Sequence, residues 1–219
     1  MNSPVPTPRT QVRRLPKRGV YERDAINAIL DEGFLCHLGF AVEGQTYVIP
    51  TGYARSGDQV YVHGSAASRM LRELISATPM CLTVTLLDGV VLARSAFHHS
   101  MNYRSVVVLG EARQVTEREE KLEALRCFTS HVLPGRWDEV RLPTDQELKA
   151  TSVIALPLNE ASAKVRSGPP VDDEPDYALD IWAGIIPMRL VAGNPTPDAR
   201  LRPDIPARKY LIPGAVVTE

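Results

Sequence analysis

The sequence predicts a mainly β protein of the α+β class, in which six or seven antiparallel strands close into a small split barrel with peripheral helices. Short runs rich in Val, Ile, Tyr and Thr follow one another with connectors of only a few residues. Such connectors favour antiparallel pairing, because a parallel pair needs a long crossover. The 219 residues are also enough for one substantial core with a tail.

The expected strands are separated by turns that contain glycine. Glu43-Gly44 separates "FLCHLGFAV" from "QTYVIPTGYA", Ser56-Gly57-Asp58 precedes "QVYVHG", and Asp88-Gly89 separates "MCLTVTLL" from "VVLARSAFH". Glycine supplies the positive φ that a tight turn needs, so each of these pairs is expected to be a hairpin. Two further strands are expected in "YRSVVVLGEARQV" and "TSVIALPLNEASAKV".

Four helices are expected around these strands. "ERDAINAILDEG" repeats apolar residues at helical spacing and stops at Gly33, and "SRMLRELISATP" ends before a proline. "TEREEKLEALRCFTSHVL" and "TDQELKAT" each begin with the T-x-x-E pattern of a capping box. We therefore expect Thr116 to pair with Glu119, and Thr144 with Glu147, at the starts of two helices.

Composition argues against several classes of function. The formal net charge of −1 provides no basic field for nucleic acid, and no apolar run is long enough to span a bilayer. Three well-separated cysteines without a C-x-x-C motif suggest reduced thiols. The adjacent His98 and His99 would point to opposite faces of a strand and could not easily chelate one ion. We expect a cytoplasmic protein without a metal site, a nucleic-acid partner or a membrane partner.

Composition also changes along the chain and divides it into three parts. Residues 1–17 are basic and rich in proline, and are expected to form a flexible arm. Residues 18–165 hold the strands and helices of the barrel. Residues 166–219 hold most of the remaining proline, and are expected to be an extension that packs on the barrel or on a dimer partner.

A candidate anion site lies where a strand meets the second expected helix. The strand ends at His63, a loop of small residues with Ser65 follows, and Ser68 and Arg69 begin the helix. Free N–H groups at a helix start, together with a guanidinium, can bind phosphate. On these residues alone the alternative is favoured, in which a serine only caps the helix and Arg69 is solvated.

Two of the expected strands also contain residues that could contact a ligand. Pro50 cannot donate a ladder hydrogen bond, so its strand is expected at an edge, a bulge or a site. A bulge would turn the backbone of Ile49 and Thr51 towards a ligand, and the alternative is an edge strand without one. Arg104 and Ser105 face opposite ways on a later strand, so one could face a ligand and the other a subunit boundary.

The order and spacing of four motifs resemble the pyridoxamine 5′-phosphate oxidase-like, FMN-binding split-barrel family, and within it the branch of nitroimidazole-resistance proteins. The motifs are "YVIPTGY", "VYVHGSAASRMLREL", "NYRSVVVLGEARQV" and "KVRSGPP…WAGIIP". The resemblance covers roughly residues 18–187. It implies a homodimer of split barrels with two FMN sites at the interface, each acting on a small molecule.

The resemblance also implies a role for each motif. The backbone of residues 48–51 would lie along the flavin ring, and Ser68 and Arg69 would bind the phosphate. Met70 stands where the oxidase pattern has lysine, which removes one phosphate charge. His63 would lie near the flavin and is the candidate catalytic residue. The implied cofactor-binding residues are Val48, Ile49, Pro50, Thr51, His63, Ser65, Ser68, Arg69, Arg104, Ser105 and Trp182.

From these implications we expect an FMN-dependent oxidoreductase that reduces or oxidises a small aromatic or nitro compound. One alternative is a protein that binds a flavin, haem or a deazaflavin without turnover. Another is an empty barrel that serves as an interaction module. In that case Arg69 would be a solvated helix charge and Trp182 an anchor of the dimer.

Overall fold

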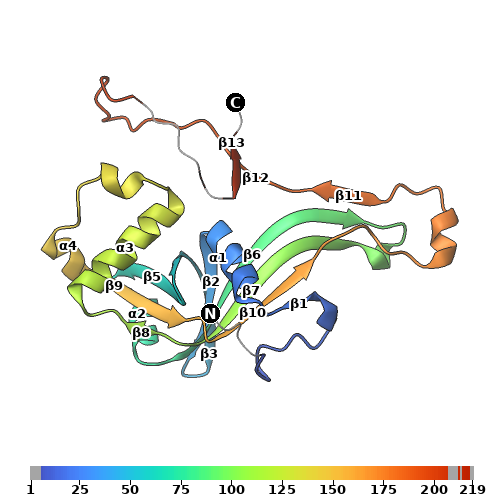
Figure 1. The fold of residues 1–219 in the computed structure, drawn as a ribbon, viewed down its shortest axis with the longest axis horizontal. Helices are drawn as coiled ribbons and strands as arrows, with labels where there is room; N and C mark the ends of the chain where they lie inside the picture. The colour runs from blue at the N-terminus through green and yellow to red at the C-terminus, as the bar shows by residue number, and fades with distance from the viewer. Residues whose placement is uncertain (1–5, 207–211, 213, 218–219) are drawn as a thin grey trace.

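The computed structural model describes residues 6–206, 212 and 214–217. An antiparallel sheet of seven strands carries most of its core (Figure 1). Neighbouring strands follow the order β1-β10-β7-β6-β2-β3, and β11 pairs with β6 beyond the end of β2. The strands of this sheet are β1 (Gly19–Val20), β10 (Glu160–Arg166), β7 (Ser100–Glu111), β6 (Pro79–Leu92), β2 (Leu35–Val42), β3 (Gln45–Gly52) and β11 (Gly184–Pro187).

A second antiparallel sheet of four strands completes the barrel, in the order β4-β5-β9-β8. Its strands are β4 (Ala54–Ser56), β5 (Gln59–Ser65), β9 (Thr151–Pro157) and β8 (Arg113–Gln114). Two short strands near the C-terminus, β12 (Leu190–Ala192) and β13 (Ala215–Val217), pair in parallel. The expected mainly β architecture with antiparallel pairing is confirmed.

Four α-helices in the described residues lie outside the sheets: α1 (Arg23–Glu32), α2 (Arg69–Ile75), α3 (Arg118–Val132) and α4 (Asp145–Ala150). Single 3-10 turns occur at Pro16–Arg18, Ala96–His98, Arg136–Glu139 and Glu174–Ala178. Ile26 and Leu30 of α1 are fully buried against the inward side chains of the large sheet, such as Leu38, Leu82 and Val106. A smaller apolar cluster lies under α3. The core therefore uses one face of each sheet, as the alternating strand patterns predict.

The prediction of a turn at Asp88-Gly89 is wrong. Strand β6 continues through these two residues to Leu92, with a bulge between Leu87 and Gly89. Gly89 does not have a positive φ. A Cβ at this position would lie 3.0 Å from the carbonyl oxygen of Ile186. Glycine is needed here for the close approach of β11, and its presence alone does not indicate a turn. Conversely, "TSVIALPLNEASAKV" forms two strands, β9 and β10.

Helix boundaries correct two further expectations. Thr144 and Glu147 form the expected capping box at α4, with both reciprocal hydrogen bonds present. Thr116 does not cap α3, because the helix begins one residue later and Glu117 occupies the N-cap without a side-chain hydrogen bond. Gly33 does end α1, but in an extended conformation. It is required there for space, since a Cβ would lie 2.8 Å from Val84 Cγ1.

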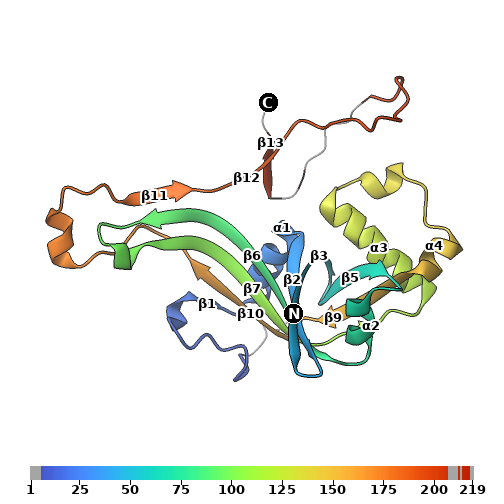
Figure 2. The ribbon, with the colours of Figure 1, turned by 180° about the vertical axis from the view of Figure 1, so that it is seen from behind.

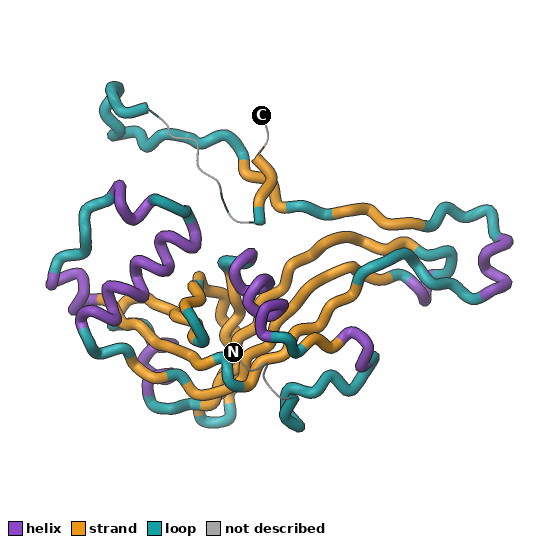
Figure 3. Tube along the Cα trace, in the orientation of Figure 1, coloured by secondary structure: helices purple, strands orange, loops and turns teal. Residues whose placement is uncertain are grey.

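The described part of the arm and the first part of the extension run along the large sheet. Residues 1–5 of the expected arm and residues 207–211, 213 and 218–219 of the extension lie outside the described residues. In the described part of the arm, Thr7 donates a hydrogen bond to Glu160 at 2.8 Å. The extension follows the projecting ends of β6 and β7 and returns beside β6 as β11, as Figures 2 and 3 show.

The polar residues at the start of β7 hold this extension in place. Arg166 Nη1 donates to Asn102 Oδ1 and to the carbonyl oxygen of Gly168, the latter at 2.9 Å. Further along, the buried carboxylate of Asp172 accepts hydrogen bonds from the backbone N–H of Arg94 at 3.0 Å and from its guanidinium at 3.1 Å. These contacts fix the path of the chain towards β11.

Candidate functional site

The strand that contains Pro50 lies at a sheet edge, as expected. Within the described residues, β3 pairs with β2 alone, and Pro50 is paired with His37. The side chains alternate, so that Val48, 64% exposed, and Pro50 face outwards while Ile49 faces the core. The other edge of β3 has no strand partner and leaves backbone groups available to a ligand.

Arg69 connects the loop before α2 to this edge strand. Its Nη2 donates a hydrogen bond to the hydroxyl of Tyr47 at 2.9 Å, and its guanidinium carbon lies 5.1 Å from the centre of the Tyr47 ring. The fold therefore brings a cation from the start of α2 beside the start of β3. This arrangement suits a ligand with a planar ring along the strand and an anionic group near Arg69.

The two serines of the loop have local hydrogen bonds of the kind that the alternative interpretation expects. Ser68 Oγ accepts from Leu71 N at 3.5 Å as the N-cap of α2, and Ser65 Oγ accepts from Ala67 N at 3.1 Å. A serine hydroxyl that accepts a hydrogen bond still has its own hydrogen to donate. Both hydroxyls are therefore compatible with an anion beside Arg69.

His63 lies under α3 and packs edge-on against Phe128, with the ring centres 4.4 Å apart. Burial lowers its pKa below the ordinary value and favours the neutral imidazole. Phe128 also covers Gly52, where a Cβ would lie 2.8 Å from the phenyl ring. The sequence analysis missed Phe128, whose only signal was an apolar position in the helical pattern of α3.

Arg104 is held away from β3 by two carboxylates. Its Nη1 and Nη2 donate to Glu32, the latter at 2.8 Å, and its Nη2 and Nε donate to Asp88 at 2.7 and 3.0 Å. These bonds to Glu32 and then Asp88 raise the pKa of Arg104. Within its own chain the guanidinium is therefore engaged. Neither acidic partner was recognised in the sequence, because Glu32 is a helix end far away and Asp88 was assigned to a turn.

Ser105 and Trp182 also lie apart from Arg69 in the single chain. Ser105 faces the opposite side of the sheet from Arg104, as expected from strand alternation, and donates to the carbonyl oxygen of Lys164 at 3.3 Å. Trp182 lies in the extension and is 66% exposed. The structure thus brings together residues of β3 with His63, Ser65, Ser68 and Arg69, and leaves Arg104, Ser105 and Trp182 elsewhere.

The outward face of the strands β3, β2, β6 and β7 carries one charged side chain, Glu111, which is paired with Pro79 at the end of β7. Residues paired across neighbouring strands share a face, which allows this surface to be traced from the register. The central part of this face contains no Asp, Glu, Lys or Arg. Its residues are Val48, Pro50, Gly52, Leu35, His37, Gly39, Cys81, Thr83, Thr85, Ser105, Val107 and Leu109.

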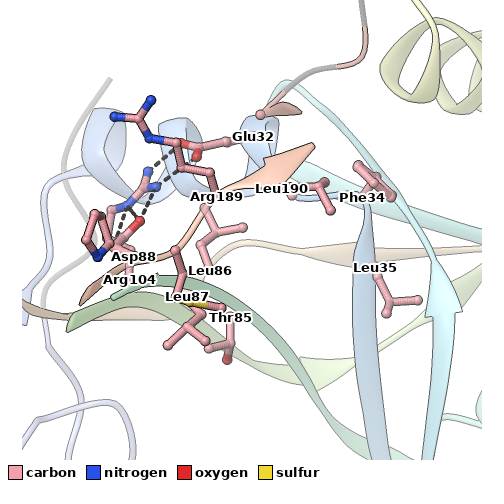
Figure 4. Close-up of a pocket in the computed structure, with 14 residues that line it drawn as sticks. Glu32, Phe34, Leu35, Thr85, Leu86, Leu87, Asp88, Arg104, Arg189 and Leu190 are labelled. Carbon is pink, nitrogen blue, oxygen red and sulfur yellow. Dashed lines mark hydrogen bonds and ion pairs between the residues drawn. The ribbon is translucent and has the colours of Figure 1, made fainter. Parts of the chain in front are cut away.

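A gap in the large sheet forms a cavity of about 680 Å³, shown in Figure 4. β2 pairs with β6 as far as Thr83, and β11 pairs with β6 from Gly89 onwards. The stretch between them, residues 84–88, lacks a strand partner on this edge within the described chain. We call this space the sheet gap. Apolar side chains and the charged group of Arg104, Glu32 and Asp88 line it.

The described residues offer neither a cluster of metal ligands nor a helix suited to crossing a membrane. They contain no group of three or more His, Cys, Asp or Glu side chains placed to hold a metal ion. None of their helices combines the length and apolar character needed to cross a membrane. His98 lies instead 3.3 Å from Asp173 in the loop region beyond β6, and His99 Nδ1 is 2.9 Å from the carbonyl oxygen of Ser95.

Known proteins match most of the chain. A family model described as pyridoxamine 5′-phosphate oxidase matches residues 22–165. The flavocytochrome Anf3 from Azotobacter vinelandii is 44% identical, with a TM-score of 0.88, covering 94% of this chain and 96% of that one. The FAD and haem binding protein from Mycobacterium smegmatis is 33% identical, with a TM-score of 0.84, covering 87% of this chain and 94% of that one.

A more distant structure shares the fold. A putative 5-nitroimidazole antibiotic resistance protein from Bacteroides thetaiotaomicron is 22% identical, with a TM-score of 0.56, covering 67% of this chain and 86% of that one. Its similarity supports the split-barrel architecture that the sequence predicts. Among curated proteins, none matches the chain.

Proposed function

This chain belongs to the pyridoxamine 5′-phosphate oxidase family, and on that premise we propose that it is a flavin-dependent oxidoreductase acting on a small aromatic or nitro compound. The contact between Arg69 and Tyr47 carries the proposal, because it places a cation beside the free edge of β3.

In the proposed site the flavin ring lies along the backbone of residues 48–51, and its phosphate accepts hydrogen bonds from Arg69, Ser68 and Ser65. When bound, the flavin would supply the redox chemistry, and the chain would set its orientation and access. His63 would provide a neutral imidazole that can accept a proton beside the ring. We propose FMN from the family resemblance. FAD, named for the relative that is 33% identical, has the same ring and first phosphate.

We further propose a homodimer formed through the central part of the outward face of β3, β2, β6 and β7. This part has no Asp, Glu, Lys or Arg, so it can be removed from water without burying an unpaired charge, while Glu111 lies at the end of β7. Val48 and Pro50 lie on this face, and so does Ser105, which would approach the cofactor bound to the other subunit. Trp182 and other exposed apolar residues of the extension, including Leu179, Ile181 and Ile186, provide additional surface for a second copy.

A second candidate function is a flavocytochrome, which the names of the two relatives above favour. Haem iron needs a neutral nitrogen or another soft ligand. His99 Nδ1 and His131 Nε2 already contact the carbonyl oxygens of Ser95 and Gly33, and His98 Nε2 lies 3.3 Å from Asp173 Oδ2 without a hydrogen bond. His37 and His63 have no hydrogen bond to another described residue. Because burial keeps His63 neutral, we propose it as the haem ligand in this case.

The visible spectrum of freshly purified protein tests both candidates. We expect a flavin spectrum whose chromophore is released by heat and identified as FMN or FAD by chromatography. A haem band in addition, lost in His63→Ala, would establish the flavocytochrome. Protein that is colourless and fails to quench the fluorescence of added FMN and FAD would refute the flavin proposal. Turnover with NAD(P)H and nitroaromatic acceptors would then separate an enzyme from a protein that only binds the cofactor.

A further inference from the structure

The sheet gap offers the free edge of a strand to a ligand. The next strand of a sheet lies about 4.8 Å away in the hydrogen-bonding direction, so the space beside residues 84–88 of β6 is where a neighbouring strand would lie, and we call this space the slot. An unpaired strand edge presents N–H donors and C=O acceptors side by side. The carbonyl oxygen of Asp88 is already used, because it accepts from Met188 N at 3.0 Å. The other backbone N–H and C=O groups of residues 84–88 point either into the gap, where a ligand can reach them, or towards β7.

The slot is closed at both ends by the chain itself. Phe34 and Leu35 bound it where β2 begins (Figure 4). Pro187 and Met188 bound it where β11 ends. An extended peptide that pairs with a strand edge needs to enter and leave along that edge. A slot blocked in both directions therefore excludes a passing peptide and admits a compact molecule.

The residues that line the slot indicate how polar its ligand should be. Its walls are mostly apolar, from Phe34, Leu35, Leu86, Leu87 and Leu190. Its charged side chains are Glu32, Asp88, Arg104 and Arg189, whose formal charges cancel. An ion would therefore lose its hydration without gaining a net opposite charge. A volume of about 680 Å³ lies in the range of small-molecule pockets.

We propose that the sheet gap binds an uncharged, planar aromatic compound that carries an adjacent N–H and C=O, such as a cyclic amide. Its rings would lie between the apolar walls, and its N–H and C=O would pair with the free edge of β6 as a neighbouring strand does. The inference goes beyond the flavin proposal, because none of its contacts involves Arg69 or residues 48–51. It also suggests the substrate class, if the bound compound exchanges electrons with the flavin.

Calorimetric titration of the purified full chain with 2-quinolone tests the inference, since this bicyclic lactam has the required edge. We expect saturable binding, and at least tenfold weaker binding of N-methyl-2-quinolone, which lacks the donor. Met188→Trp should fill the slot and weaken binding of 2-quinolone at least tenfold. Met101→Trp is the matched control, because Met101 is also an exposed methionine but does not line the slot. It should leave binding unchanged.

Flavin binding is measured separately, so that the two proposals can fail independently. Met188→Trp should keep its flavin, and Arg69→Glu should keep its affinity for 2-quinolone. Hydrogen exchange at the amides of residues 84–87 should slow when 2-quinolone is added. Absence of saturable binding would overturn the inference. Equal affinity for the two quinolones together with normal binding by Met188→Trp would also overturn it, and so would displacement of 2-quinolone by FMN.

Discussion

Reversing the charge of Arg69 should remove phosphate recognition and leave the fold intact. The Arg69 side chain is exposed, and its described polar contact is the hydrogen bond to Tyr47. Loss of an exposed contact of this kind changes the free energy of unfolding by less than about 1 kcal/mol. In the flavin complex the same guanidinium would instead make charge-assisted hydrogen bonds to a phosphate, each contributing roughly 1.5–3 kcal/mol.

Arg69→Glu removes these bonds and adds repulsion. Two like charges about 6 Å apart repel by about 0.7 kcal/mol in water and by about 3 kcal/mol at an effective dielectric constant of about 20. Together with one lost hydrogen bond, this repulsion weakens FMN binding by at least about 2 kcal/mol. Every 1.4 kcal/mol of binding free energy is a factor of ten in affinity. We therefore expect the dissociation constant for FMN to rise at least about thirtyfold.

Quenching of flavin fluorescence measures this effect, with riboflavin as the ligand control. Riboflavin has the same ring without the phosphate, so its affinity should be the same in Arg69→Glu and in the unmodified protein. Arg72→Glu is the protein control, since Arg72 is an exposed arginine of the same helix with no described ion pair. An unchanged affinity for FMN in Arg69→Glu, or an equal loss for riboflavin, would refute the assignment of Arg69 to the phosphate.

Three further predictions concern stability, and urea unfolding measures each of them. Thr144→Ala should lower the free energy of unfolding by about 1 kcal/mol, because it removes the capping box of α4. Thr116→Ala should change the free energy of unfolding by less than about 0.5 kcal/mol, because Thr116 does not cap α3. Equal effects of the two substitutions would contradict the observed start of α3. Tyr53→Phe should cost about 1–3 kcal/mol, because the buried hydroxyl donates to the carbonyl oxygen of Leu30 at 2.7 Å, and a neutral result would mean that this oxygen finds another donor. The lowered pKa of His63 means that the unfolded chain binds a proton more readily, so stability should fall as the pH decreases below about 6.5. His63→Gln should lose this part of the pH dependence, and an unchanged profile would contradict the assignment.

Local signals in the sequence were sufficient for many elements of the fold. Alternating apolar residues and short connectors predicted antiparallel strands, and Pro50 placed its strand at an edge because proline lacks a donor. The capping box of Thr144 was predicted correctly because both of its hydrogen bonds lie within four residues. The order of motifs also indicated the family, since that order reflects the whole barrel.

The role of some residues depends on a distant partner that the sequence did not reveal. Gly89 suggested a turn, but its role is to admit β11, which lies far along the chain. Glu32 and Asp88 hold the Arg104 guanidinium within the single chain, which no local signal indicated, and its contact with the cofactor stays a prediction. In each case the residue type was informative, and the neighbour that decides its role comes from another part of the sequence.

The sequence by itself thus determined the strands and most of the helices, and it pointed to a candidate anion site, because these follow from periodicity, turn chemistry and side-chain type. The tertiary structure alone decided that Arg69 meets β3, that Arg104 does not, and that β2 and β11 leave a gap along β6. Strand register and the path of the extension decide which of these residues meet and where the gap lies. Both result from packing across the whole core, and no short stretch of sequence encodes them.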